Sequence, residues 1–451
     1  MSISKNPTEL GTERIGKLLA QYAIPAIIAM TASSLYHITD SIFIGKGVGA
    51  LAISGLTITF PFMNLSAAFG SLVGAGASTL LSIRIGQKDY ETANTILGNV
   101  ITLNIIIGVL FAAVALIFLD PILYFFGASE TTLPYAREFM QIILLGNVIT
   151  HIYFGLNAIL RSAGSSEKAM YATIFTVGIN IILNPLFIFV FNWGIRGSAL
   201  ATIIAQTIML CWQLKLFSDK TNFIHFKKGI FKLRKRIVID SLSIGLSPFM
   251  MNAAACLVVV VITRSMTRME GDLAAGAYGI VNRIAFLFVM IVMGLNQGMQ
   301  PIAGYNFGAR LYGRVNEVLK KTIILATCVT TLGFLVVELF PHTIASIFTD
   351  DKEQTVLVAN GLRITFVMFP IIGMQMVTAT FFQSIGMAGK AIFLSLSRQL
   401  LFLLPCLLIL PYFFEINGIW YSLPISDFLS SIIACFMLMY YYRQFRNSGN
   451  R

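Results

Sequence analysis

Charged residues are scarce in this sequence. They make up 12% of the chain, against about a quarter of a typical soluble domain. Hydrophobic residues make up 57%, and the mean hydropathy is +0.80. This composition excludes an ordinary soluble domain and indicates a membrane protein. The 36 glycines favour helices that pack closely against one another within a bilayer.

The sequence also lacks the patterns of common enzyme and metal sites. Its five cysteines fall inside apolar segments, at spacings that match neither a disulfide framework nor a metal site. The four histidines are scattered, no His-Glu-x-x-His occurs, and "SIGMAGKA" lacks the full spacing of a phosphate-binding loop. We therefore expect neither an enzyme nor a cofactor.

Apolar runs long enough to cross a bilayer recur along the chain. A helix of about 20 apolar residues spans the hydrocarbon core, and on this measure the sequence predicts twelve spans. They lie near residues 15–44, 52–82, 94–118, 136–160, 169–191, 196–216, 240–263, 274–306, 318–340, 358–383, 391–413 and 418–442. An all-α integral membrane protein is therefore expected.

Basic residues are distributed unevenly between the two sides of these spans. With the N-terminus inside, 23 Lys and Arg residues fall in inner segments and six in outer segments. Because cytoplasmic loops carry an excess of Lys and Arg, both termini are predicted to be cytoplasmic. The net charge of +12 then requires no nucleic-acid partner. The longest hydrophilic stretch, residues 218–240, is expected to lie on an anionic inner leaflet of membrane lipids.

A constant shift of 222 residues superposes polar landmarks of the two halves. "RSAGSSEKA" (161–169) falls on "QSIGMAGKA" (383–391), and "IGQKDYETANTIL" (85–97) falls on "FGARLYGRVNEVL" (307–319). Each half has six predicted spans, an even number, so both halves enter the membrane from the same side. We predict two six-helix lobes related by a pseudo-two-fold axis along the membrane normal.

The predicted lobes cover residues 1–217 and 240–451, with a cytoplasmic linker at residues 218–239. Two such lobes around a central cavity suit alternating access. This architecture favours a transporter over a channel or a membrane enzyme.

An acidic residue stands inside the first predicted span. Asp40 lies six residues before Lys46, which places it about 9 Å below the outer end of the helix. His37 lies one turn earlier on the same face. Because a carboxylate inside a membrane is costly, we interpret Asp40 as a cation or proton site, with local capping near the interface as the alternative. His37 is either a hydrogen-bonded structural histidine or a proton relay.

Other helices of the first half carry neutral polar groups. Asn180 and Asn184 stand four residues apart, directly before Pro185, and Thr202 lies on the next predicted helix. Oxygen ligands suit small hard cations. Together with Asp40, these groups predict a sodium site or a proton site; singly, each would be an ordinary contact between helices.

The second half has fewer readable features. Arg283, Arg398 and Asp427 lie within predicted spans. Buried charges of opposite sign usually compensate each other, so we expect ion pairing rather than a transport role, and the sequence does not indicate which pair forms.

Several ordered motifs resemble the multidrug and toxic compound extrusion (MATE) family, in particular its bacterial branch of DinF-like and MepA-like pumps. They are "TDSIFIGKGVGALAISGLTITFPF" (39–62), "RSAGSSEKAM" (161–170), "GINIILNPLFIF" (178–189), "GSALAT" (197–202), "GMQPIAGYNFGAR" (298–310) and "SRQLLFLLP" (397–405). The resemblance runs nearly end to end.

The resemblance implies export of bulky cationic or aromatic drugs, driven by inward flow of sodium ions or protons across a bacterial cytoplasmic membrane. It also implies that the coupling site lies in the first lobe and includes Asp40. The family pattern Asn-x-x-x-Asp-Pro falls on Asn180 and position 184, where this chain has Asn instead of Asp. Only one carboxylate then remains, so sodium binding is expected to be weaker and coupling to a proton is favoured.

The substrate is expected between the lobes, against soft and adaptable side chains. The candidates are Phe60, Met63, Phe154, Asn157 and Met209, and core packing is the alternative for each. A monomer is expected. The rival function is a flippase for lipid-linked saccharides, although such flippases generally need a strongly cationic cavity. A major-facilitator carrier is disfavoured because "RIGQKDYETA" (84–93) does not match the basic loop of that class.

Overall fold

The computed structural model describes residues 9–270, 272–349 and 351–449, and within these ranges it contains helices and no strands. The side chain of His37 and those of a few other helical residues lie outside that description. The helices of the first half are α1 (Glu9–Thr12), α2 (Ile15–Gly47), α3 (Ala50–Gly86), α4 (Tyr90–Ile117), α5 (Leu119–Phe125), α6 (Leu133–Leu145), α7 (Asn147–Ser162), α8 (Ser166–Pro185), the π-helical η1 (Leu186–Val190) and α9 (Gly194–Ser218).

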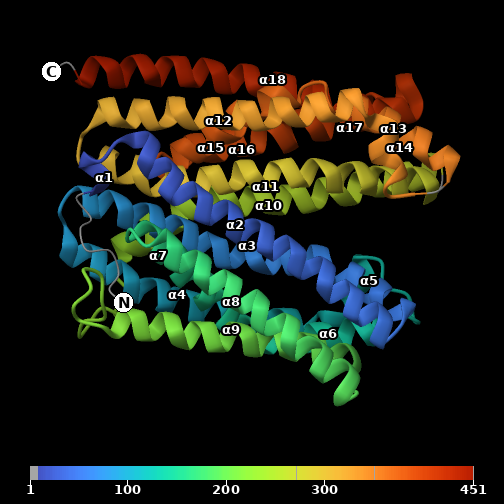
Figure 1. Ribbon diagram of the computed structural model, residues 1–451, viewed down its shortest axis with the longest axis horizontal. Coiled ribbons are helices and arrows are strands. Elements are labelled where there is room, and N and C mark those ends of the chain that lie inside the picture. The colour runs from blue at the N-terminus through green and yellow to red at the C-terminus, as the bar shows by residue number, and fades with distance from the viewer. Residues whose placement is uncertain (1–8, 271, 350, 450–451) are drawn as a thin grey trace. The chain divides into compact units, whose positions relative to one another are not determined.

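The second half has a similar series of helices. They are α10 (Lys235–Glu270), α11 (Asp272–Gly308), α12 (Tyr312–Leu339), α13 (Pro341–Ser346), α14 (Lys352–Phe366), α15 (Phe369–Ser384), α16 (Ala388–Leu396), the π-helical η2 (Ser397–Leu403), α17 (Leu404–Ile409) and α18 (Pro411–Gly449). Figure 1 shows the course of these helices from blue to red.

The membrane spans agree with the sequence prediction. Within the described residues, ten helices are long and apolar enough to cross a membrane. Two bent pairs, α6 with α7 and α14 with α15, bring the total to as many as twelve if each pair is one span. The bends are 57° and 54°. The all-α fold with many spans is therefore confirmed. The segments predicted as the fourth and tenth spans are bent, which the sequence did not indicate.

The predicted repeat recurs in the backbone. Lys88 and Arg310, which are 222 residues apart, have φ values of 61° and 60°. Gly164 and Gly386, at the same shift, have φ values of 88° and 77°. Positive φ is uncommon outside glycine, so matching values at Lys88 and Arg310 are a specific structural signature. The two halves share the same loop geometry after their second and fourth spans.

The chain divides into two compact units at boundaries that differ from the predicted lobes. The first unit holds Ile28–Phe249, and the second holds Glu13–Ile27 together with the residues from Met250 onward. The predicted linker and the start of α10 thus belong to the first unit, and the start of α2 belongs to the second. Both changes fall at equivalent positions, shortly after Pro25 and Pro248, because α2 and α10 each have segments that pack in different units.

Glycines allow this close packing. A Cβ atom on Gly76 of α3 would lie 1.8 Å from the carbonyl oxygen of Ser241 on α10, inside the first unit. Gly298 of α11 is its partner in the repeat, and a Cβ atom there would lie 2.6 Å from Ala23 of α2, inside the second unit. Small residues let helix backbones approach in membranes. Equivalent glycines therefore allow close contact of α3 with α10 in the first unit and of α11 with α2 in the second unit.

An apolar core in the first unit joins the helices that carry Asp40 and its neighbours. It includes Ile44 of α2, Ile188 of η1, Ala199 of α9 and Phe139 of α6, all essentially buried. Ile44 lies one turn after Asp40, and Ala199 directly follows Ser198. This core fixes the separation of α2, η1 and α9, and so positions the polar groups described below.

Candidate ion-coupling site

The polar groups of the first unit meet where α8 changes its helical geometry. Asn184 and Pro185 end α8, and the π-helical η1 follows directly. Proline has no N–H and cannot donate to the carbonyl one turn earlier, and π-helical turns are frequent at functional sites. Helices α8 and α9 run side by side at this level (Figure 1).

Asp40 is the centre of the site and is only 5% exposed. The Nδ2 amide of Asn184 donates to its Oδ1 at 2.5 Å, and the hydroxyl of Ser198 donates to the same oxygen. Both donors are neutral. Within the described residues, no ion pair involves Asp40. A buried carboxylate without a countercharge is costly, so this site favours a bound cation or a neutral, protonated acid.

Two acceptor atoms in the site have no donor. Oδ2 of Asp40 takes part in no hydrogen bond with any part of the chain that the structure describes. Oδ1 of Asn184 is buried and has no partner there either. Buried acceptors are normally satisfied. Oδ1 of Asn184 is therefore a buried acceptor that is short of a donor or a cation, whereas Oδ2 of Asp40 is not among the buried unsatisfied atoms.

A second layer of hydrogen bonds supports Ser198. The hydroxyl of Thr202 donates to the carbonyl of Ser198 at 3.1 Å and accepts from Nδ2 of Asn180 at 3.1 Å. The hydroxyl of Tyr36 lies 2.7 Å from that of Thr202. A threonine hydroxyl has one proton, so with that proton on the Ser198 carbonyl, Tyr36 is the donor. Helices α2, α8 and α9 are thus joined by one network.

The structure brings four of the five predicted coupling residues together. Asp40 and Asn184 are in direct contact, and Asn180 and Thr202 are one layer away. The fifth is His37, whose side chain lies outside the described residues. The coupling role of the set stays a prediction.

Sequence reasoning missed Ser198 and Tyr36. Each stands four residues before a predicted site residue, Ser198 before Thr202 and Tyr36 before Asp40. Residues four apart share a helix face, so this spacing was a usable signal.

The polar residues of α7 form a separate cluster. Asn147 accepts a hydrogen bond from the hydroxyl of Ser66 at 2.6 Å, and Nε2 of His151 lies 3.0 Å from the carbonyl of Ser66. Thr150 donates to Gln206 of α9 at 2.5 Å. None of these bonds reaches Asp40, so this cluster joins α3, α7 and α9 as internal packing.

The predicted substrate residues differ in exposure. Phe60 and Phe154 are 45% and 44% exposed, and Met63 is half-buried against the apolar core. Asn157 is buried and donates to the carbonyl of Ala169 at 3.0 Å, while Met209 is buried. Only the first three present surface to a ligand, and their role in binding stays a prediction.

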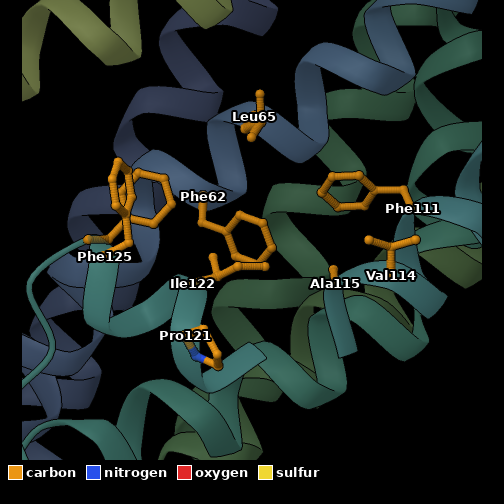
Figure 2. A pocket seen from close by; sticks show the side chains of 9 residues that line it. Phe62, Leu65, Phe111, Val114, Ala115, Pro121, Ile122 and Phe125 are labelled. Carbon is orange, nitrogen blue, oxygen red and sulfur yellow. The ribbon is translucent and has the colours of Figure 1, made fainter. Parts of the chain in front are cut away.

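An apolar groove of about 410 Å³ lies elsewhere in the first unit. Figure 2 shows Phe62 of α3, Phe111 and Val114 of α4, and Pro121 and Ile122 of α5 around it. It shares no lining residue with the Asp40 network or with the predicted substrate set. Its lining is apolar and offers no charged side chain to a cation.

The second unit contains an ion pair of the kind expected from the sequence, which had not indicated the two residues that form it. Nε of Arg398 donates to Oδ1 of Asp427 at 2.7 Å, joining η2 to α18. Arg283 is exposed on α11 and takes part in no ion pair within the described residues. Pairing is therefore the observed state of Arg398 and Asp427, and the expectation does not hold for Arg283.

Repeated halves with many membrane spans, and a buried carboxylate held by neutral groups, are features of multi-pass membrane transport proteins. The comparisons identify its family. Residues 25–186 and 248–408 match the family model described as MatE, and the chain belongs to this family of multidrug efflux transporters.

Relatives of known name agree with this assignment. The multidrug export protein MepA of Staphylococcus haemolyticus is 27% identical over 424 residues, which cover 94% of this chain and 93% of that protein. The MATE multidrug transporter DinF-BH, solved in complex with a ligand, is 35% identical with a TM-score of 0.90, and each chain is covered completely. A MATE structure in a bent conformation has a TM-score of 0.93 at 21% identity, covering 99% of this chain and 100% of the other, and supports the fold alone.

Proposed function

We propose that this protein exports cationic or aromatic drugs in exchange for inward-moving protons, by alternating access between its two lobes. The coupling group is Asp40, with Asn184 and Ser198 as its direct partners and Asn180 and Thr202 behind them. Sodium is the alternative coupling ion. Drug export is supported by the MepA and DinF-BH relatives, whose names describe multidrug export and multidrug transport.

Two observations support the choice of a proton: both donors to Asp40 go to Oδ1 and leave Oδ2 for a proton, and Oδ1 of Asn184 is buried without a donor. A proton on Oδ2 of Asp40 neutralises the only carboxylate of the network and adds the donor that the site lacks. Asn184 contributes no second negative charge with which to hold sodium. Loss of that proton leaves a buried anion without a countercharge, a state that an incoming cationic drug stabilises.

The energy available from one proton is sufficient for export. One charge that crosses 100 mV releases about 2.3 kcal/mol, and a tenfold proton gradient adds about 1.4 kcal/mol. Their sum sustains a gradient of roughly several hundred-fold per proton for a neutral drug. For a monovalent cationic drug the exported charge cancels the potential contribution, and the proton gradient alone sustains about a tenfold drug gradient per proton. The proton and the drug must favour opposite states of the transporter by comparable free energies.

The proposed setting is a bacterial cytoplasmic membrane, with both termini in the cytoplasm and the protein acting as a monomer. The distribution of basic residues between loops supports the orientation. Reporter enzymes that are active on one side only, fused to either end, test it. Activity of both fusions on the outer side would reverse it.

Transport of ethidium, a fluorescent aromatic cation, across proteoliposome membranes tests the coupling. The dye is followed under an imposed proton gradient, under a sodium gradient and under neither. We expect the proton gradient alone to drive transport, and Asp40→Asn to abolish it. Asp89→Asn is the matched control, because Asp89 accepts from the Thr92 N–H at the start of α4 and asparagine caps a helix equally well.

Two outcomes would overturn parts of the proposal. Transport driven by sodium alone would assign sodium as the coupling ion and retain Asp40. Absence of dye movement under every gradient, with a folded protein, would remove drug antiport and make lipid-linked saccharides the next substrates to test.

A further inference from the structure

The segment between α9 and α10, residues 219–234, forms a strap that is attached to α4. It appears in Figure 1 as the yellow-green loop beyond the end of α9. Both the strap and α4 lie in the first compact unit. The hydrogen bonds described above for the Asp40 network join α2, α8 and α9, whereas those of the strap described below reach α4.

One asparagine of α4 holds the strap at three points. Nδ2 of Asn99 donates to the carbonyls of Ile230 and Lys232, each at 3.0 Å, and Oδ1 accepts from the N–H of Arg234 at 2.9 Å. Asn99 is buried, and its bond to Ile230 is buried with it, whereas the bonds to Lys232 and Arg234 are partly buried. A single side chain thus fixes the backbone of the strap over five residues.

The strap runs along the flank of α4 rather than across its end. The N–H of His225 donates to Asn94 at 2.9 Å, and the hydroxyl of Thr102 donates to the carbonyl of Phe231 at 3.1 Å. A Cβ atom on Gly98 would lie 2.4 Å from the carbonyl oxygen of Ile230. Thr102 lies twelve residues into α4, or about 18 Å along the helix. The strap therefore reaches well along the side of the span.

The two faces of the strap differ. Ile224 and Ile230 are buried against the unit, whereas Phe231 and Leu233 are 48% and 42% exposed. The ring of Phe231 lies 6.0 Å from that of Phe226, which supports it from within the strap. Two apolar side chains are thus presented outward by a fixed backbone.

The outward face continues the apolar surface of α4. Ile105 and Ile106 begin about one turn after Thr102, and they are exposed, as are Val109 and Leu110. Exposed apolar side chains on a membrane span contact lipid chains. Because Thr102 is bonded to the Phe231 carbonyl, Phe231 lies directly beside this lipid-facing surface.

Basic residues flank the two apolar ones along the sequence. Between residues 220 and 236 the chain has seven basic residues and no acidic residue. All seven are exposed: Lys220, Lys227, Lys228, Lys232, Arg234, Lys235 and Arg236. Arg234 lies 3.8 Å from Glu91, an exposed pair that neutralises little. The patch remains strongly cationic.

We propose that the strap is a docking surface for an anionic phospholipid leaflet. Phe231 and Leu233 enter the leaflet at the level where headgroups meet acyl chains, and the basic side chains bind the lipid phosphates. Lys and Arg extend apolar stems toward the membrane and keep their charges at its surface. Polybasic segments beside a span attract anionic lipids in this way.

Lipid-chain quenching of a tryptophan at position 231 tests the proposal on the full chain. Phe231→Trp is reconstituted with phosphatidylglycerol or phosphatidylcholine brominated on the acyl chain, at equal mole fraction. The signal of the parent, which has three native tryptophans, is subtracted. We expect phosphatidylglycerol to quench about twofold more than phosphatidylcholine, and about 1 M salt to remove the difference because the Debye length falls to about 3 Å.

Charge removal provides the second arm. The triple variant Lys227→Gln, Lys228→Gln and Lys232→Gln should lose the excess quenching by phosphatidylglycerol. The matched control removes three lysines outside the strap, Lys17→Gln, Lys320→Gln and Lys321→Gln, and should retain it. All six lysines reach the surface, so folding is not at issue.

Two results would overturn the proposal. Equal quenching by both lipids, unchanged in the triple variant, would mean contact with lipid but no recognition of its charge. Absence of quenching by either lipid would place the introduced indole in water and leave the patch to an acidic soluble partner. Neither result bears on ion coupling, because the readout is fluorescence quenching rather than transport.

Discussion

Two aspartates in membrane-spanning helices have opposite surroundings. Asp40 in the first unit and Asp427 in the second are each 5% exposed. Asp427 is bonded to the guanidinium of Arg398, whereas Asp40 has only neutral donors. A compensated charge has little reason to exchange its proton or bind a cation. The two repeats therefore differ in how they hold a buried acid: Asp427 is paired with a cation, and Asp40 is the acid to which we assign coupling in the proposed function.

The largest effect on stability is expected from removal of the negative charge of Asp427, which compensates the charge of Arg398. Asp427→Asn leaves Arg398 without its partner. Breaking a buried ion pair costs about 3–5 kcal/mol, and since Arg398 is 30% exposed, about 2 kcal/mol is expected after discounting for solvent. Thermal unfolding of the purified protein measures the loss.

Asp40→Asn is the matched comparison in the other unit. The amide oxygen of asparagine still accepts from Asn184 and Ser198, so we expect no comparable fall in the unfolding temperature. The restoring variant is Arg398→Met with Asp427→Leu, because apolar residues often replace a buried pair without loss. Equal destabilisation by Asp40→Asn and Asp427→Asn would show that both carboxylates contribute equally to the stability of the fold, and would contradict the proposed difference between them.

A smaller effect is expected from adding a second carboxylate beside Asp40. Asn184→Asp restores the acid of the family pattern and should create a sodium site, since two carboxylates share a bound cation more readily than one. Sodium at ten times its dissociation constant would then stabilise the variant by about 1.4 kcal/mol. Unfolding temperatures in sodium chloride and choline chloride provide the measurement.

The control for this gain moves the carboxylate instead of adding one. Asp40→Asn combined with Asn184→Asp keeps a single negative charge and should not respond to sodium. A sodium response of the parent protein that equals that of Asn184→Asp would contradict the proposed proton preference.

The spans and the repeat were accessible from the sequence because both are local patterns. Hydropathy marks an apolar run, and the shift of 222 residues appears as matched loop residues such as Gly164 and Gly386. Bends are different. The break between α6 and α7 falls at Gly146 within an apolar run, and hydropathy does not distinguish a bent run from a straight one.

The candidate site was predicted in its residues but not in its contacts. Asp40 is conspicuous as a carboxylate among apolar residues, whereas Ser198 resembles any hydroxyl that bonds within its own helix. Its contact with Asp40 depends on how α2 and α9 pack. The attachment of the hydrophilic strap was hidden for a related reason: the strap resembles a free linker in the sequence, and its bonds to Asn94, Asn99 and Thr102 of α4 join segments that are far apart along the chain.

The smallest effect on transport is expected at Tyr36, which is linked to Asp40 only through Thr202 and Ser198. Tyr36→Phe removes the hydroxyl that donates to Thr202 and leaves the Thr202 bond to the Ser198 carbonyl in place. A net hydrogen bond contributes about 1 kcal/mol, so the rate of ethidium transport should fall by about fivefold or less. The control is Tyr171→Phe, where the aromatic contact with Phe175 is retained. An unchanged rate in Tyr36→Phe would separate this layer from coupling and confine the site to Asp40, Asn184 and Ser198, while complete loss would extend the site to Tyr36.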